Sequence, residues 1–134
     1  LLGRETLYRR PICGLHTDAI ALVAEVIESK SKPSMPSGVI AETAFGEVAS
    51  AVDRGTVRQS ILAIGIQDID PVGLHPPPGM QFLGSCSDHL IVETVEDDLI
   101  VGQETTFQLS YNALLRAMTS PFVSKNYDVR NIPH

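Results

Sequence analysis

The stretch MQFLGSCSDHLIVETVED, residues 80–97, decides the fold, because apolar and β-branched residues flank a polar middle. We predict a strand through it. In an extended chain only every second side chain shares a face, so the polar middle divides into Cys86 and Asp88 on one face and Ser85, Ser87 and His89 on the other. Neighbours on one face would stand roughly 6–7 Å apart, too far for a nucleophile to hydrogen-bond its base. We therefore expect no catalytic triad within this run.

Other apolar runs predict further short strands. One covers residues 23–27, one runs from Ile61 to the Asp70–Pro71 boundary, and a short one lies near Val39 and Ile40. The proline-rich segment VGLHPPPG, residues 72–79, predicts a rigid loop, and Gly102 predicts a turn before a Thr/Phe strand.

A single segment has a helical pattern. SYNALLRAMTSP, residues 110–121, places Leu114, Leu115 and Met118 at helical spacing before Pro121. Five or six short strands and one short helix near the C-terminus predict an all-β fold, a small barrel-like domain or a sandwich.

Composition narrows the class of protein. The chain has 134 residues, of which 43% are hydrophobic and 19% charged, which fits one soluble domain over residues 1–134. A net charge of -6 with ten Lys and Arg residues argues against a nucleic-acid partner. No apolar run approaches the ~20 residues that cross a bilayer. Cys13 and Cys86 form no CxxC motif, so we expect free thiols and a cytoplasmic protein.

Motif searches leave several candidates open. No phosphate-binding glycine loop, HExxH or GxSxG motif occurs. Cys86 with His89 could contribute to a zinc site, but no second ligand pair lies nearby, so we predict no metal. The histidines in loops or at the terminus receive no role: His16, His75 and His134. Asp68 and Asp70 form either a carboxylate pair on one strand face or polar caps before a turn, and spacing alone favours the turn.

Four segments in order resemble one known family. They are LLGRET (1–6), ILAIGIQDID (61–70), LGSCSDHLIV (83–92) and SYNALLRAMTSPFV (110–123). Together they resemble the C-terminal β-domain of the alanine racemase-like (fold type III) pyridoxal phosphate enzymes, and most closely the ornithine racemase branch. The second and third stand where alanine racemases read like IGYADG and GxxCMDQ. The resemblance covers nearly the whole chain.

The resemblance implies a set of roles. The segment with Ser87 and Asp88 would reach the partner subunit's active site near the substrate carboxylate, and Tyr111 would hold the phosphate of the pyridoxal 5'-phosphate cofactor. Asp70 would contact the side-chain ammonium of a diamino acid such as ornithine or lysine, whereas Asp68 would have a structural hydrogen-bonding role. The resemblance also implies a homodimer of the full enzyme and a small amino-acid substrate.

Two departures from the family pattern qualify this interpretation. Alanine racemases use a tyrosine from this domain as one catalytic base, but the corresponding SGVIAETAFGE, residues 37–47, contains none. Glu42, Asp88 and Cys86 are the candidates to replace it, since a carboxylate or thiolate with a shifted pKa could do so. The cofactor-bearing lysine is not matched by any of Lys30, Lys32 and Lys125.

These departures lead to an expectation about the whole protein. We expect the barrel that carries the cofactor lysine to precede Leu1 in a longer chain, and the fragment alone to be inactive. The alternatives are a stand-alone β-domain for binding or assembly, and part of a metal-assisted lyase with the same cofactor that uses Cys86 and His89.

Overall fold

The computed structural model describes residues 2–34, 53–95 and 98–128. The predicted short strand near Val39 and Ile40 and the candidate base Glu42 lie outside these residues. No helix in the described part of the chain is long and apolar enough to cross a membrane.

Strands dominate the described residues and form one antiparallel sheet in the order β3-β6-β1-β2-β5-β4. The strands are β1 Ala21–Pro33, β2 Thr56–Leu62, β3 Leu74–His75, β4 Met80–Ser85, β5 Leu90–Thr94 and β6 Glu104–Leu109. A 3-10 turn, η1 Pro71–Gly73, precedes β3, and the helix α1 Tyr111–Thr119 follows β6. The prediction of an all-β, barrel-like domain with one short helix is confirmed.

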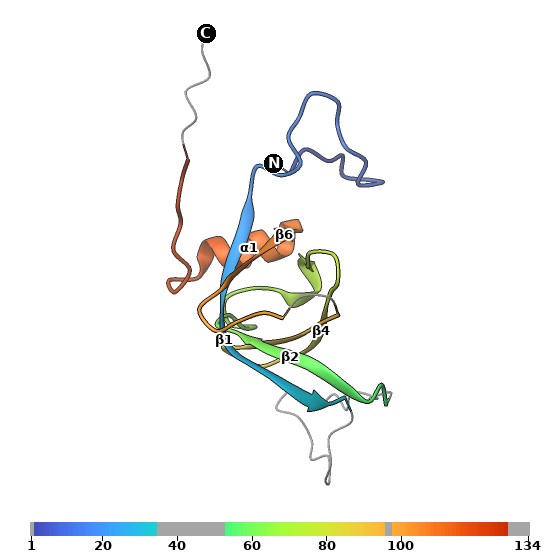
Figure 1. Cartoon of the computed structure of the whole chain (residues 1–134). Helices are drawn as coiled ribbons and strands as arrows, with labels where there is room; N and C mark the ends of the chain where they lie inside the picture. Colours follow the sequence, from blue (N-terminus) through green and yellow to red (C-terminus); the bar gives the residue numbers. More distant parts are fainter. Residues whose placement is uncertain (1, 35–52, 96–97, 129–134) are drawn as a thin grey trace.

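The sheet curls because β1 serves two partners in succession (Figure 1). Its first half, Ala21 to Glu25, pairs with β6, and its second half pairs with β2. The register shifts between Val26 and Glu28, where the strand changes partner. A bulge of this kind bends a strand and increases its twist, so the six strands form a half-barrel.

The core fills the concave side of this half-barrel. Side chains alternate between exposed and buried along β1 and β6, as expected for a sheet with one solvated face. Phe107 is fully buried, and its ring stacks on Phe82 with 5.9 Å between centroids. The helix adds three side chains to the core: Ala113, Leu114 and Ala117.

The helix buries a different set of side chains from the set that its sequence pattern predicts. Leu114 is buried as expected, but Leu115 and Met118 lie half-exposed. The buried face contains small residues because α1 approaches η1 closely, where a Cβ on Gly73 would lie 2.9 Å from the Cβ of Ala113. Large side chains do not fit this contact, so they take the outer face.

The prediction for residues 61–70 is wrong in its boundaries. The strand begins earlier, at Thr56, and ends at Leu62. A turn follows, in which the carbonyl of Gly65 accepts hydrogen bonds from the N–H groups of Asp68 and Ile69. The backbone therefore turns within the apolar run from Ile61 to Ile66, and the strand does not continue to Asp70.

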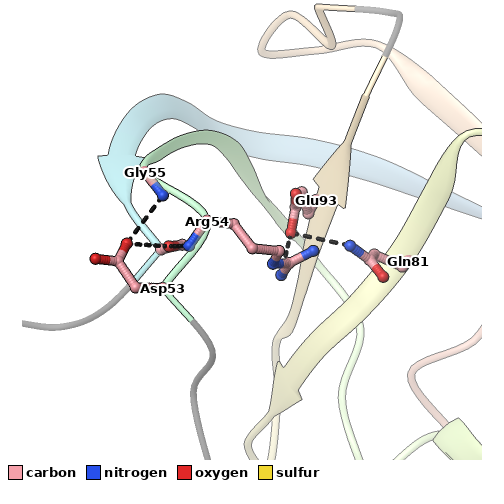
Figure 2. Close-up of polar contacts among 6 residues, drawn as sticks. Asp53, Arg54, Gly55, Gln81 and Glu93 are labelled. Atoms are coloured by element: carbon pink, nitrogen blue, oxygen red, sulfur yellow. Dashed lines mark hydrogen bonds and ion pairs between the residues drawn. The ribbon is translucent and has the colours of Figure 1, made fainter.

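An ion pair links the start of β2 to the neighbouring hairpin. Figure 2 shows Arg54 extending to Glu93, with 2.6 Å between Arg54 Nη2 and Glu93 Oε2. Gln81 Nε2 donates to the same oxygen at 3.1 Å. The Glu93 side chain is only 8% exposed, so its charge needs these partners. Ser34 N–H donates to the carbonyl of Gly55, which joins the end of β1 to the start of β2.

Candidate functional site

The polar middle of residues 80–97 is a hairpin turn between β4 and β5. The two strands pair from Met80 with Thr94 to Ser85 with Leu90, and the N–H of Cys86 donates to the carbonyl of His89 at 2.9 Å. The prediction of a single extended strand is therefore wrong here. A cluster of Ser and Asp residues between two apolar runs is a turn signal, and this signal outweighs the strand alternation.

The turn brings together side chains that an extended chain would separate. Asp88 Oδ1 lies 3.5 Å from Cys86 Sγ and 3.2 Å from His89 Nδ1. Cys86 Sγ lies 3.7 Å from His89 Nδ1, so these atoms form a closed triangle. Ser87 Oγ donates to Asp88 Oδ1 at 3.1 Å. The expected division of the run into two faces is thus replaced by one cluster of Cys86, Ser87, Asp88 and His89.

The loop at residues 65–67 packs against the polar turn and forms hydrogen bonds to its backbone. The N–H groups of Ile66 and Gln67 donate to the carbonyls of Cys86 and Ser87, each at 2.9 Å. Gly65 makes this approach possible, since a Cβ at that position would lie 2.4 Å from the backbone nitrogen of Asp88. The backbone of the polar turn is therefore held in position by residues 65–67.

Hydrogen bonds favour the charged form of Asp88. The Ser87 hydroxyl lowers the pKa of the Asp88 carboxyl most, the Cys86 thiol lowers it further, and a charged His89 adds to the effect. Asp88 is therefore a carboxylate at neutral pH. A carboxylate with a lowered pKa is a weak proton acceptor and a good partner for a cation.

An open pocket of about 410 Å³ lies beside the turn. Ser85, Cys86 and His89 line one part of it, and β1, β2 and β5 supply the rest: Ile27, Glu28, Ile61 and Ile91. Glu28 pairs with Lys30 at 2.9 Å and with Lys32 at 3.2 Å, and these hydrogen bonds lower the pKa of its carboxyl. Its lining thus combines three isoleucine side chains with the polar side chains of the turn and of Glu28.

Asp68 and Asp70 do not share a strand face. Asp68 lies in the turn after β2, is 6% exposed and accepts a hydrogen bond from Ser120 Oγ at 2.6 Å. Asp70 is the N-cap of η1, where its Oδ1 accepts from the N–H of Val72 at 3.2 Å. Asp68 thus ties the turn to the end of α1, and Asp70 is the more accessible of the two carboxylates.

Tyr111 begins α1 and is 49% exposed. Its neighbour Ser110 is the N-cap, with no side-chain cap hydrogen bond, and the Ser110 N–H donates to the carbonyl of Gly73. The first turn of the helix packs against η1, where a Cβ on Gly73 would lie 3.1 Å from the backbone nitrogen of Ala113, so this side of the helix start faces protein. Both cysteines are free and exposed, as predicted.

Sequence reasoning missed His89 and Gly65. In the sequence, His89 is a candidate only as half of a ligand pair with Cys86, because strand alternation predicts that it lies on the face opposite Cys86 and Asp88. The run of five polar residues after Gly84 was the available signal for a turn. Gly65 has no local signal, since its role depends on a hairpin that lies more than twenty residues later.

A curled antiparallel sheet with one closing helix is consistent with the C-terminal domain of alanine racemase-like enzymes. The particular relatives are two amino-acid racemases. Ornithine racemase of Acetoanaerobium sticklandii is 41% identical over an alignment of 128 residues that covers 93% of this chain and 36% of that racemase. Lysine racemase of Thermotoga maritima is 42% identical over an alignment of 130 residues that covers 96% of this chain and 37% of that racemase.

The chain thus spans about 36% of the length of the curated racemases it matches. Over nearly its whole length it is similar to the C-terminal domain of these ornithine and lysine racemases, as the four sequence segments predicted. No family model matches the chain. No solved structure matches it either.

The contact between Gly65 and the polar turn gives a first prediction. Gly65→Ala should destabilise the protein by about 1–3 kcal/mol, because the added methyl group forces the backbone of residues 87–89 to move. Urea denaturation measures this change. Gly84→Ala is the matched control, since a Cβ there meets nothing within 4 Å, and its effect should stay within about 0.5 kcal/mol. Equal effects of the two substitutions would mean that the turn does not rest on Gly65.

Proposed function

We propose that this chain is the C-terminal β-domain of a pyridoxal phosphate-dependent racemase that acts on ornithine, lysine or a similar diamino acid. The observation that carries the proposal is the identity of 41% and 42% to an ornithine racemase and a lysine racemase over nearly the whole chain. The matched region includes the polar turn, the Asp68–Asp70 segment and α1. A cytoplasmic location fits the two free thiols.

The first turn of α1 fits the phosphate of the cofactor. Tyr111 would donate its phenolic hydrogen to a phosphate oxygen. The exposed position of Tyr111 leaves its hydroxyl accessible to such a ligand. The cofactor, when bound, supplies an electron sink that allows a proton to leave the substrate Cα.

The polar turn fits the substrate side of the site. Ser87 and Asp88 are exposed at the tip of a hairpin that a second loop holds in place, so they can reach a neighbouring subunit without rearranging the sheet. Asp70 offers a further carboxylate at a separate surface position, where it would bind the side-chain ammonium of the substrate. Asp68 has a buried structural bond and supports the same loop.

A racemase also needs a group that moves a proton on the second face of the substrate Cα. Asp88 is a weak proton acceptor because hydrogen bonds from Ser87 and Cys86 lower the pKa of its carboxyl. Cys86 has His89 Nδ1 within 3.7 Å, an arrangement in which an imidazole can take the thiol proton. Of the two candidates in the described part of the chain, the geometry therefore favours Cys86 over Asp88, and Glu42 stays a candidate from the sequence alone.

Exposed apolar side chains support assembly as a homodimer. The outer face of α1 presents Tyr111, Leu115 and Met118, at 49%, 51% and 47% exposure, along one stripe of the helix. Phe122 follows the helix and is also exposed. A contiguous apolar surface of this kind is typical of a protein interface, and in a racemase dimer it would cover the partner's barrel.

The proposal is tested by measuring racemisation directly. The complete protein that contains this chain, loaded with pyridoxal phosphate, should convert L-ornithine or L-lysine to the D-enantiomer faster than it converts L-alanine. Chiral chromatography quantifies the products. Formation of no D-amino acid from any of the three, with the cofactor bound, would contradict the proposal.

Replacing Tyr111 tests the cofactor contact. In the complete protein, Tyr111→Phe should weaken cofactor retention by about 10- to 100-fold, because one charge-assisted hydrogen bond to phosphate is lost. Equilibrium dialysis against pyridoxal phosphate measures the affinity. Tyr127→Phe removes the hydroxyl of another exposed tyrosine and should leave the affinity unchanged. Unchanged affinity in the Tyr111 variant would remove this role.

Replacing Asp70 tests substrate selection. Asn is as good an N-cap as Asp, so Asp70→Asn removes the charge and keeps the bond to the N–H of Val72. In the complete enzyme kcat/KM for ornithine or lysine should fall by about 10- to 100-fold, whereas a neutral amino acid should lose little. Asp18→Asn, at another exposed carboxylate, should change neither value. Equal losses for charged and neutral substrates would mean that Asp70 only supports its loop.

A further inference from the structure

We propose that Cys86, Asp88 and His89 form a Zn²⁺ site with an open fourth coordination position. The cluster offers one thiolate sulfur, one carboxylate oxygen and one imidazole nitrogen, all within 4.8 Å of one another. Sulfur, nitrogen and oxygen ligands together are typical of zinc. Three protein ligands and one open position are typical of zinc sites that bind a small molecule or water.

The distances between the ligand atoms match one face of a tetrahedron around zinc. Zinc bond lengths of about 2.3 Å to sulfur and about 2.0 Å to nitrogen and oxygen imply tetrahedral edges of about 3.5 Å from sulfur to oxygen or nitrogen, and about 3.3 Å from nitrogen to oxygen. The observed separations are 3.5 Å for Cys86 Sγ to Asp88 Oδ1, 3.7 Å for Cys86 Sγ to His89 Nδ1, and 3.2 Å for Asp88 Oδ1 to His89 Nδ1. The side chains therefore need little movement to bind the ion.

The backbone of the turn is already fixed for this purpose. The Cys86 N–H donates to the carbonyl of His89, and the loop at Ile66 and Gln67 donates two further backbone hydrogen bonds to the turn. Ser87 Oγ donates to the same Asp88 oxygen that would bind zinc, and an outer hydrogen bond of this kind orients a ligand. Binding of a metal ion would therefore cost little conformational entropy of the backbone.

The open position has access to solvent and to the adjacent pocket. Cys86 and His89 line the pocket of about 410 Å³, and all three ligand side chains are at least partly exposed. We expect water at the fourth position, which a carboxylate of a small molecule could replace. While zinc is bound, the Cys86 thiolate is a ligand, so Cys86 can accept a proton only in the metal-free protein.

Metal binding to the full 134-residue chain tests this site independently of racemase activity. Isothermal titration with ZnCl₂ under reducing conditions should show one site per chain. Co²⁺ as a probe should give a thiolate-to-cobalt charge-transfer band and the intense visible bands of tetrahedral coordination. Circular dichroism before and after the titration checks that the ion binds to the folded chain.

Substitutions assign the site to particular side chains. We expect each of three substitutions to weaken Zn²⁺ binding: Cys86→Ala, Cys86→Ser and His89→Gln. Loss of a residue that only hydrogen-bonds to a metal ligand weakens binding by roughly 10- to 100-fold, so loss of a ligand itself should cost at least as much. The two cysteine variants should also abolish the charge-transfer band. Cys13→Ala and His75→Gln are matched controls at another free thiol and another exposed histidine, and both should bind as before.

Three results would overturn the proposal. The first is the absence of saturable binding to the folded chain, and the second is octahedral cobalt bands without a charge-transfer band. The third is an equal loss of affinity in the Cys13 and Cys86 variants, which would indicate nonspecific thiol binding. Because the racemase assay is a separate measurement, neither failure implies the other.

Discussion

The domain depends on the way one strand, β1, connects two halves of the sheet. Val26 is the point of connection: its N–H donates to the carbonyl of Gln103, its carbonyl accepts from Gly102, and its register partner across the sheet is Leu62. Val26 is also fully buried. A straight strand could not satisfy both neighbours, so the bulge after Val26 is what curls the sheet and creates a concave side large enough for Phe107 and the rest of the core.

The candidate site follows from this curl through a chain of direct contacts. The loop after β2, residues 65–69, lies between the polar turn and α1. On one side it donates backbone hydrogen bonds to Cys86 and Ser87. On the other side its carbonyls at Ile66 and Ile69 accept from Arg116 Nη1 at 2.9 and 3.3 Å. The element proposed for the cofactor phosphate and the element proposed for the substrate are thus attached to the same loop.

The acidic side chains of the domain fall into a buried group and an accessible group. Glu93 is buried and paired with Arg54 and Gln81, and Asp68 is buried and bonded to Ser120, so these acids contribute to the fold. Asp70 and Asp88 are more accessible. Accessible carboxylates on supported turns are suited to a cation. The proposed ammonium contact uses Asp70, whereas the proposed zinc site uses Asp88, which the proposed function also places on the substrate side.

The sequence by itself determined the fold class, the helix at its C-terminal side and the resemblance to amino-acid racemases. These features have local signals in the sequence. Alternating apolar residues predict strands, Gly102 predicts a turn, and the helical spacing around Leu114 predicts the helix. Only the tertiary structure decided where the run at residues 61–70 turns and that Leu115 and Met118 face outward. It also decided that Cys86, Asp88 and His89 meet. These outcomes depend on close backbone approaches at Gly65 and Gly73 to segments distant in the chain, which no local pattern encodes.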